Sequence, residues 1–457
     1  KWFYNFSLEE RVPRDHLLRA IAEAVDFSFV RGLVRHTYSH TGAPSVDPVV
    51  VFKMALLGYL YGITSERRLA EEIRLNLAYM WFLGYDIDET PPDHSILSKA
   101  RKRYGPEAYR QFFNEIVRQC AERGLVDGDR LYLDASLVKA DASLDSLVSR
   151  PLYSQLPGVD DYVRRLWAEN EEPAGEDGED PAAPPEAPVK GHGDKAGPRA
   201  NQRRVSRTDP GAAIISVRNK GVLLAHKVHV AVDGGPARVI TGIAVTSGDR
   251  PESHQVESLL AQHVWLVGSR PEELVADRGY GTMRVYRFLR RQRILPSIPR
   301  RSPWRHKGAM RRREFVYVPG LDRYRCPQGR WLYRQEVTPQ GLVRYRTHRY
   351  ACRGCNHKPR CTRAERCTIT RPADMATREW VDAHLATRRA RLSLRRRACW
   401  AETVIADLKG NHGLARAVLR GAAFEVQALL AAAAHNIKRL AQHRPPNVLA
   451  HRTSPQL

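Results

Sequence analysis

The spacing of apolar residues along the chain first indicates helices. Within residues 64–85, Leu69, Ile73 and Leu77 recur at near-helical spacing, with charged residues between them. The same kind of pattern runs through the first quarter of the chain. We therefore expect an all-helical domain over residues 1–125.

After this domain the pattern changes to short runs rich in β-branched and aromatic residues, which are typical of strands. The first run is 130–134, and two more, 223–232 and 239–245, flank a turn sequence Asp-Gly-Gly-Pro that predicts an antiparallel hairpin. An amphipathic helix from Val256 and a further strand ending at Asp277 follow. The order strand, hairpin, helix, strand, helix predicts an α/β core with a mixed sheet.

Two segments interrupt this expected core. Residues 169–205 begin with a stretch dominated by Glu, Asp, Pro, Ala and Gly, which predicts a disordered acidic linker without chemistry. Residues 300–385 combine basic runs with short Tyr- and Val-rich strands, which predicts a small β-rich subdomain. The core is then expected in three parts, residues 126–168, 206–299 and 386–445, followed by a tail over residues 446–457.

The charge of the chain narrows the class of partner. The 457 residues hold 74 Lys and Arg against 50 Asp and Glu, a net charge of +24, which favours a polyanion, nucleic acid first. An anionic membrane surface is the alternative, but the longest apolar run, residues 49–60, contains Lys53 and is too short to span a bilayer. The first residues show no secretory pattern, so a cytoplasmic, nucleoid-associated location is expected.

The cysteines suggest a local metal site. Seven cysteines are too few for a disulfide scaffold in a chain of this length, and five of them lie between Cys326 and Cys367. Reduced thiols without a ligand are the alternative. The predicted Zn²⁺ ligands are Cys326, Cys352, Cys355 and Cys361, with Cys367, His348 or His357 as substitutes.

Three carboxylates are candidates for a catalytic metal site. Phosphodiester cleavage by two metals needs carboxylates that converge on ions about 3.5–4 Å apart. Asp134 and Asp277 each end an expected strand, and Glu402 lies on an expected helix over residues 398–409. Strand ends and a helix face can converge, but an Asp at a strand end is more often a turn former or a helix cap.

The segments around these carboxylates resemble the DDE transposases of bacterial insertion sequences. The resemblance rests on YLDASLVKADAS from Tyr132, VADRGY from Val275, and Glu402 with Lys409; it extends to HKVHVAVD from His226, VTSGD from Val245, SRTDP from Ser206 and DHS from Asp93. It implies an RNase H-like core, a mixed sheet flanked by helices, in which Asp134, Asp277 and Glu402 hold two Mg²⁺ ions that Mn²⁺ can replace. Similar transposases also carry a Cys-rich insertion.

Around Glu402 the chain departs from the pattern of much of this superfamily, which is Tyr, two residues, Arg, three residues, Glu, six residues, Lys. The corresponding positions hold Arg395, Ala398, Glu402 and Lys409, so only the Glu and the Lys match. The candidates for the missing cation are Arg396 and Arg397, and the fallback carboxylates are Asp407 and Glu425. Seven residues are about two helical turns, so Lys409 is expected to share a face with Glu402 and to bind a terminal phosphate.

Basic and aromatic residues supply the expected DNA contacts. A helix-start signal at Pro91–Ser95 opens a basic helix that either reads DNA or presents a solvated charged face. Trp400 either stacks on an unpaired base or packs in the interior, whereas His226 and His229 are interpreted as structural or substrate-side groups and not as metal ligands. The predicted DNA contacts are Lys99, Arg101, Lys102, Arg103, Arg278, Tyr280, Arg311, Arg312, Arg396, Arg397, Trp400 and Lys409.

Together these features predict a transposase that binds the terminal inverted repeats of an insertion sequence through its helical domain. It is expected to assemble as a homodimer or higher oligomer on DNA, and to cut DNA and join the ends to a target. Two alternatives remain: a metal-dependent nuclease without strand transfer, and a catalytically inactive DNA-binding regulator. The intact Asp134 and Asp277 argue against the inactive regulator.

Overall fold

The computed structural model describes residues 7–38, 45–154, 200–217, 221–300, 310, 314–338, 341–362 and 364–443. The described residues form two compact units: those within 1–170, 196–276 and 393–457 make up the first, and those within 277–392 the second. Most of the expected linker, the basic run with Arg311 and Arg312, and the tail 446–457 lie outside the described residues. The end of the expected linker is an exception, because residues 200–205 form a short helix and the start of a strand.

The N-terminal segment is helical, as predicted. Its helices are α1 Leu8–Arg11, α2 Leu17–Ala24, α3 Phe29–Val34, α4 Pro48–Leu60, α5 Glu66–Leu75, α6 Leu77–Leu83 and α7 Ser95–Glu122. The periodic segment 64–85 is two helices, because Asn76 ends α5 and its side chain accepts hydrogen bonds from Ala78 N and Tyr79 N at the start of α6. Helix α7 bends at Gly105, whose φ of 70° only glycine adopts readily, before Pro106.

The first unit also contains a mixed sheet, which confirms the predicted fold class. Its strands are β1 Arg130–Lys139, β4 Ala213–Val217, β5 Gly221–Asp233, β6 Ile240–Ser247 and β7 Glu273–Val275. Strand β5 pairs antiparallel with β1 on one side and with β6 on the other, so the predicted hairpin is present, and β1 runs parallel to β7. Strand β4 was not predicted, and it pairs with the first residues of β5.

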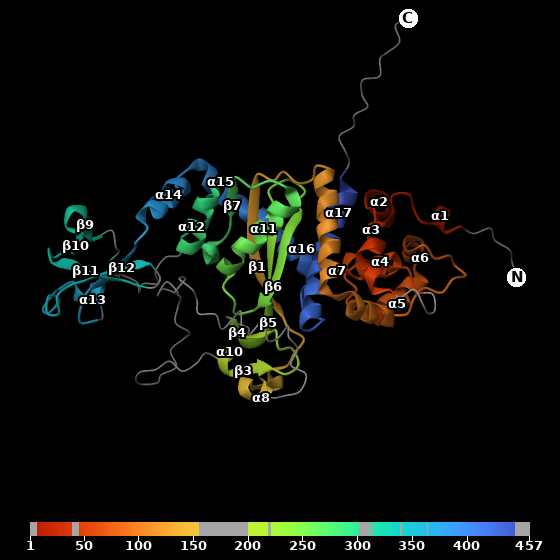
Figure 1. The fold of residues 1–457 in the computed structure, drawn as a ribbon, viewed down its shortest axis with the longest axis horizontal. Helices are drawn as coiled ribbons and strands as arrows, with labels where there is room; N and C mark the ends of the chain where they lie inside the picture. Colours follow the sequence, from red (N-terminus) through yellow and green to blue (C-terminus); the bar gives the residue numbers. More distant parts are fainter. Residues whose placement is uncertain are drawn as a thin grey trace, which may run out of the picture. The chain divides into compact units, whose positions relative to one another are not determined.

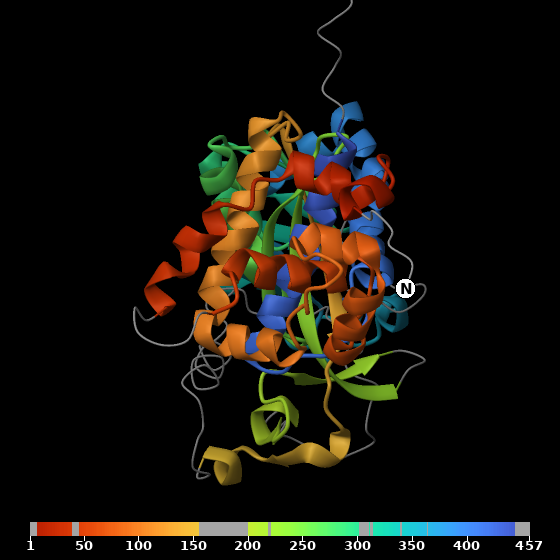
Figure 2. The ribbon, with the colours of Figure 1, turned by 90° about the vertical axis from the view of Figure 1, so that its right-hand side faces the viewer.

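One buried helix joins the N-terminal helices to the sheet. Helix α17 Ala422–Gln442 is buried along most of its length and contacts α2, α4, α7 and β6. Figures 1 and 2 show α7 and α17 side by side. The run of four alanines Ala431–Ala434 leaves little side-chain bulk, so neighbouring elements approach α17 closely. The helices and the sheet therefore form one unit, although the sequence predicted a separate domain over residues 1–125.

The remaining elements of the first unit are short or C-terminal. They are β2 Leu147–Ser149, α8 Arg150–Ser154, α10 Ala200–Arg203, β3 Arg204–Ser206, α11 Val256–Val267 and α16 Thr403–Asn411. Helix α15 Arg388–Arg397 starts in the second unit and ends in the first. Between α15 and α16, residues Ala398–Glu402 form a π-helical turn.

The second unit holds the predicted β-rich insertion. After α12 Met283–Gln292 and β8 Leu295–Ser297, five strands form an antiparallel sheet in the order β13-β12-β11-β10-β9. Their bounds are β9 Val316–Val318, β10 Arg323–Arg325, β11 Trp331–Val337, β12 Leu342–Arg346 and β13 Thr368–Pro372; α13 Lys358–Cys361 and α14 Met375–Leu385 complete the unit. Its small core joins aromatic residues such as Tyr324 and Tyr345 to Cys352 and Cys367.

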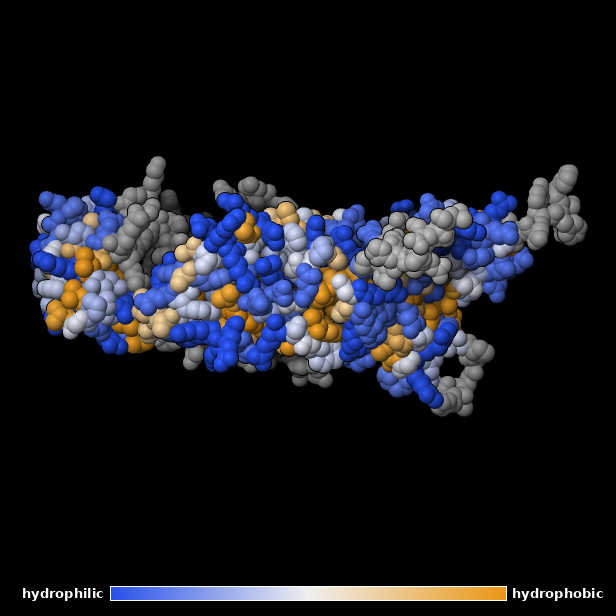
Figure 3. Space-filling model, turned by 90° about the horizontal axis from the view of Figure 1, so that it is seen from above, coloured by the Kyte–Doolittle hydropathy of each residue, from blue (hydrophilic) through white to orange (hydrophobic). Residues whose placement is uncertain are grey.

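The surface agrees with the basic, polar composition. The face seen in Figure 3 is mostly hydrophilic, and its apolar residues lie in separate small patches. Among the described residues, none of the helices is both long and apolar enough for a bilayer span.

Candidate active site

Asp134 lies in the middle of β1, not at the end of a strand as the sequence predicted. Residues 135–139 continue the strand because they pair with residues 225–229 of β5, a partner that local sequence does not reveal. Only 14% of the Asp134 side chain is exposed, and its Oδ1 accepts a hydrogen bond from Ala135 N at 2.9 Å. The carboxylate is therefore held by the most central strand of the first unit.

Glu402 is the last residue of the π-helical turn, and 51% of its side chain is exposed. Arg397 forms ion pairs with Glu402 and with Asp134, 3.5 Å from the Asp134 carboxylate. One guanidinium thus brings together two of the three predicted catalytic carboxylates.

The π-helical turn explains why the family spacing is missing from the sequence. In an α-helix, side chains three or four residues apart share a face, and the family pattern has its Arg four residues before the Glu. A π-helical turn adds one residue, so that residues five apart align. Arg397 precedes Glu402 by five residues and contacts it, so it supplies the cation that Ala398 does not.

The hairpin between β5 and β6 holds this turn in place. The Trp400 indole N–H donates to Gly234 O and Gly235 O at 2.9 and 3.1 Å, and its ring stacks on Tyr132. Arg238, with a φ of 54°, donates to Cys399 O at 3.0 Å and Thr403 Oγ1 at 3.1 Å. These contacts favour the interior packing of Trp400 over base stacking. Arg238 was not among the residues predicted from the sequence, because only the tertiary fold brings it to the turn.

Lys409 shares the C-terminal helix with Glu402 but is already engaged by the sheet. Its ammonium donates to Ser136 Oγ at 2.7 Å and to Leu137 O at 2.8 Å. Lys409 therefore ties α16 to β1 beside Asp134. If Lys409 also binds a phosphate, as predicted, its ammonium must do so while it donates these two hydrogen bonds.

Asp277 follows β7 and is the first residue of the second unit. Its Oδ1 accepts from Gly279 N at 2.7 Å and so caps the short turn Arg278–Tyr280. Arg278 is exposed, as expected of a DNA contact, whereas Tyr280 is fully buried. The expected DNA contact of Tyr280 does not fit this placement, because its ring lies in the core.

The two fallback carboxylates have other partners. Glu425 is paired with Arg110 of α7, and Asp407 Oδ2 lies 2.8 Å from His435 Nδ1. The neighbouring His412 and His435 side chains hold the pKa of Asp407 well below its usual range. Neither carboxylate shares the Arg397 contact with Asp134.

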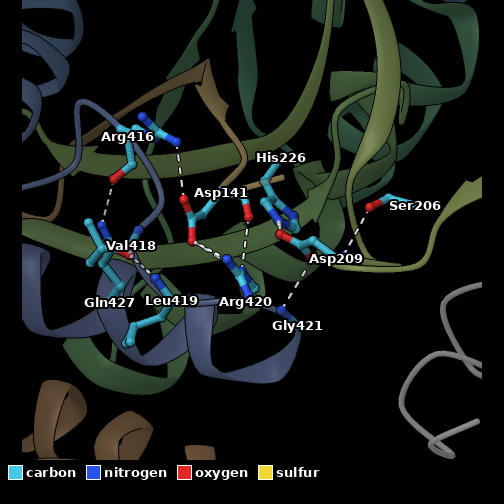
Figure 4. A network of polar contacts seen from close by, with 10 residues as sticks. All are labelled: Asp141, Ser206, Asp209, His226, Arg416, Val418, Leu419, Arg420, Gly421 and Gln427. Carbon is cyan, nitrogen blue, oxygen red and sulfur yellow. Dashed lines mark hydrogen bonds and ion pairs between the residues drawn. The ribbon is translucent and has the colours of Figure 1, made fainter. Parts of the chain in front are cut away.

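A network of polar contacts links the end of β1 to the start of α17 (Figure 4). Asp141 pairs with Arg416 at 3.1 Å and with Arg420 at 2.7 Å. Asp209, fully buried, pairs with His226 at 2.8 Å and accepts from Gly421 N. This placement fits the structural interpretation of His226.

His229 is likewise buried in the sheet. Its Nε2 lies 2.9 Å from Thr246 Oγ1 of β6. Burial lowers the pKa of His229 to about 3, so its imidazole is neutral at physiological pH. The placement agrees with a structural role and not with an exposed substrate-side group.

The predicted basic helix is α7. Lys99, Lys102 and Arg103 are exposed on it, whereas Arg101 is 17% exposed and paired with Glu66. Arg101 therefore stabilises the helical region, and its predicted role as a DNA contact does not fit. Arg396, next to the π-helical turn, is exposed.

The clustered cysteines of the second unit line one cavity. Its lining includes all four predicted zinc ligands together with Cys367 and His357. The Sγ atoms of Cys361 and Cys367 are 3.4 Å apart, so the structure brings the substitute ligand Cys367 into the cluster. Neighbouring thiols and burial raise the pKa of Cys367 well above its usual range, which favours the neutral thiol unless a cation is bound.

Comparison with known proteins agrees with this architecture. Residues 6–103 match the family model of a transposase domain (DUF772), and residues 325–441 match that of a transposase DDE domain. The first match covers the N-terminal helices, and the second includes Arg397, Glu402 and Lys409. Both matches are to transposase families, in agreement with the resemblance to DDE-type transposases, a class whose members use divalent metal ions.

Among solved structures, the chain is similar to one described as a piggyBac transposase synaptic complex with hairpin DNA. The two are 11% identical, the match covers 95% of this chain and 76% of the other, and the TM-score is 0.36. At that TM-score the likeness supports no conclusion about this chain. No curated protein matches the sequence.

Proposed function

We propose that this protein cuts and joins DNA at the ends of an insertion sequence, with two divalent ions held by Asp134, Asp277 and Glu402. The observation that carries the proposal is the shared contact of Asp134 and Glu402 with Arg397. The positively charged guanidinium of Arg397 contacts both carboxylates. Two negatively charged carboxylates that lie close together need such a positive charge between them, and a metal ion can supply it as well. Bound Mg²⁺ would supply an activated water or 3′-hydroxyl and would stabilise the leaving oxygen.

The strand register supports Asp277 as the third ligand. In the parallel pair β1 and β7, Tyr132 lies beside Val275. Asp134 follows Tyr132 by two residues, and Asp277 follows Val275 by two residues. Each carboxylate residue thus follows the last paired position of these two parallel strands by two residues.

The protein's own residues would divide the work. Asp134 supplies a ligand from a strand paired on both sides, and Glu402 supplies one from an exposed turn that the Arg238 hairpin holds. Before metal ions bind, Arg397 neutralises the negative charge of the two carboxylates. When the ions displace its guanidinium, that group can bind a DNA phosphate. Lys409 keeps the helix against β1.

DNA binding is assigned to exposed cations. Lys99, Lys102 and Arg103 lie on α7 within the matched transposase domain, and α7 contacts α17 beside the sheet. Phosphate contacts of this kind fix position, and base contacts select the sequence. We assign the terminal inverted repeats to this helical region, and we expect a homodimer or higher oligomer on DNA and a nucleoid-associated location.

The test replaces each carboxylate by its amide: Asp134→Asn, Asp277→Asn and Glu402→Gln. Each variant should bind an end fragment as the unaltered protein does, because affinity comes mainly from Lys and Arg contacts to phosphates. Cleavage with Mg²⁺ should fall at least about 100- to 1000-fold, the size of effect that loss of one preorganised charge-stabilising group produces. Glu425→Gln, a carboxylate paired with Arg110, is the matched control and should cut normally.

Other results would favour the alternatives. Normal cutting by Glu402→Gln with a dead Glu425→Gln would move the third ligand and leave the enzyme class intact. Cleavage without joining to a supercoiled target would identify a nuclease. Binding of ends without cutting, in Mg²⁺ or Mn²⁺, would identify a regulator.

A further inference from the structure

A further group of side chains that could hold a metal ion lies where α16 packs against α17. Asp407 is on α16, His412 follows that helix, and His435 is on α17; one ligand atom from each lies within 4.8 Å of the others. Among the described residues, this is the one group of three or more His, Cys, Asp or Glu side chains whose ligand atoms all lie this close together. All three belong to the first unit, and neither histidine side chain is exposed.

Backbone carbonyls determine the protonation of both imidazoles. His412 Nδ1 lies 2.8 Å from Tyr59 O, and His435 Nε2 lies 3.2 Å from Arg238 O. A carbonyl oxygen can only accept, so each of these nitrogens must donate. The lone pair of each neutral ring is then on its other nitrogen, His412 Nε2 or His435 Nδ1. Metal-binding histidines are usually oriented in this way, by an N–H donated to a carbonyl.

Both lone pairs point at the same carboxylate. His435 Nδ1 is 2.8 Å and His412 Nε2 is 3.5 Å from Asp407 Oδ2. Without a cation, the lone pairs of both neutral rings would face the lone pairs of this carboxylate, unless one of the three groups took up a further proton. His412 Nε2 is buried and has no hydrogen-bond partner among the described residues.

We propose that Asp407, His412 and His435 bind a structural divalent transition-metal ion of the zinc class. Two imidazoles and a carboxylate suit Zn²⁺, which binds them at about 2.0–2.2 Å with a fourth, tetrahedral position open to water. In a tetrahedron with such bond lengths the ligand atoms lie about 3.3 Å apart, and the two distances from the imidazoles to Asp407 Oδ2, 2.8 and 3.5 Å, lie on either side of this value. The ion removes the conflict between two neutral imidazoles and one carboxylate oxygen.

The charged and polar neighbours moderate the affinity of this site. Asn411 Nδ2 donates to Asp407 Oδ1 at 2.7 Å, which leaves Oδ2 for the ion. The Arg439 guanidinium lies 4.0 Å from Oδ2, and burial lowers the pKa of the nearby Lys438. These cations oppose a divalent ion, so the site is expected to bind zinc less tightly than a thiolate cluster does.

The ion would cross-link the elements that carry the active site. Asp407 follows Glu402 by five residues, and His435 anchors α17. Through Tyr59 and Arg238 the same imidazoles contact α4 and the hairpin that holds the π-helical turn. The role is one of positioning, so it does not depend on the proposed chemistry at Glu402.

Two substitutions remove a ligand and keep its second hydrogen bond. In His412→Asn the amide N–H replaces Nδ1–H toward Tyr59 O, and in His435→Gln it replaces Nε2–H toward Arg238 O. His263→Asn is the matched control, because His263 is also buried and its Nδ1 lies 2.8 Å from Thr241 Oγ1, outside the cluster. The full chain is stripped of metal and titrated with Zn²⁺ and with Co²⁺.

The unaltered protein and His263→Asn should bind one more zinc per chain than either ligand variant. Zinc affinity at this site should fall by at least about 100-fold, since even loss of an outer-shell partner can cost that much. The Co²⁺ spectrum of the lost site should lack the thiolate charge-transfer band that a cysteine cluster gives.

Equal zinc content in the unaltered protein and a folded ligand variant would overturn the proposal. Should both variants fail to fold, the Co²⁺ titration of the unaltered chain decides. A spectrum with only thiolate bands, or with no tetrahedral band at all, would also overturn it, whatever the cleavage activity of the protein.

Discussion

Two carboxylates of the C-terminal helical segment, five residues apart, lie in opposite surroundings. Glu402 is 51% exposed and shares Arg397 with Asp134, whereas Asp407 is 25% exposed and faces two imidazoles that are not exposed at all. The first group is open and consists of oxygen ligands with an arginine counter-ion. The second is closed and rich in nitrogen ligands.

The difference shows how one segment can serve chemistry and stability together. Arg397 is a partly exposed counter-ion that a metal ion can displace, so we expect the Asp134 and Glu402 carboxylates to be accessible to Mg²⁺, which keeps several waters and binds through few carboxylates. Buried imidazoles cannot be replaced without opening the fold, which is typical of structural sites. If both proposals hold, acidic residues near each other in sequence divide between catalysis and positioning according to their burial.

The largest effect on folding should come from loss of zinc at the cysteine cluster. This prediction tests whether a buried metal site with thiolate ligands stabilises the second unit, as we propose for the imidazole site in the first. Zinc bound by thiolates contributes directly to folding. We expect about one zinc per chain at this cluster, and Cys352→Ser should lose it and unfold the β-rich part of the second unit, seen by proteolysis and metal analysis. Cys399→Ser, an exposed cysteine outside the cluster, is the control and should change neither. Metal-free, folded protein with all five clustered thiols reactive would exclude this site.

The next largest effect should be a loss of folding stability in acid, caused by the buried histidines of the first unit. Burial lowers the pKa of His229 to about 3 and of His263 to about 4, from 6.5 for the unfolded chain. Below pH 6.5 the unfolded state therefore binds more protons than the folded state, and stability falls as the pH falls. The loss at pH 5 should be about 2 kcal/mol per histidine, measured by urea unfolding at pH 7.5 and pH 5.

The variant His263→Asn tests this assignment. It should be less stable at pH 7.5 but should lose about 2 kcal/mol less between the two pH values. An unchanged pH dependence in this variant would show that other groups cause the acid sensitivity.

The smallest effect concerns the counter-ion of the open site. Arg397→Gln removes a positive charge beside Asp134 and Glu402, so Mn²⁺ affinity there should rise roughly five- to tenfold, the size expected for a partly exposed charge pair. Zinc content should not change. Arg395→Gln removes an exposed guanidinium two residues earlier and should leave Mn²⁺ affinity nearly unchanged. Weaker Mn²⁺ binding in Arg397→Gln would mean that the arginine orders the carboxylates for metal.

Periodicity and motif together determined most of the architecture. The helical N-terminal segment, the β5–β6 hairpin, the strand before Asp277 and the final helices follow from which positions are apolar, because each period matches one kind of backbone. The resemblance to the family could also be recognised from the sequence, because it rests on residue types and short spacings around Asp134 and on the pair Glu402 and Lys409. The two family matches confirm that class.

Only the tertiary structure decided how these pieces are used. Strand β1 extends past Asp134 because β5 pairs with it, and Tyr280 is buried although its motif is basic and polar. The π-helical turn moves the cation from position 398 to Arg397, a shift of one residue that no local propensity signals. Asp407 and His435 meet because α16 and α17 pack together. Sequence specifies local periods and residue chemistry, whereas burial and long-range pairing are properties of the packed chain.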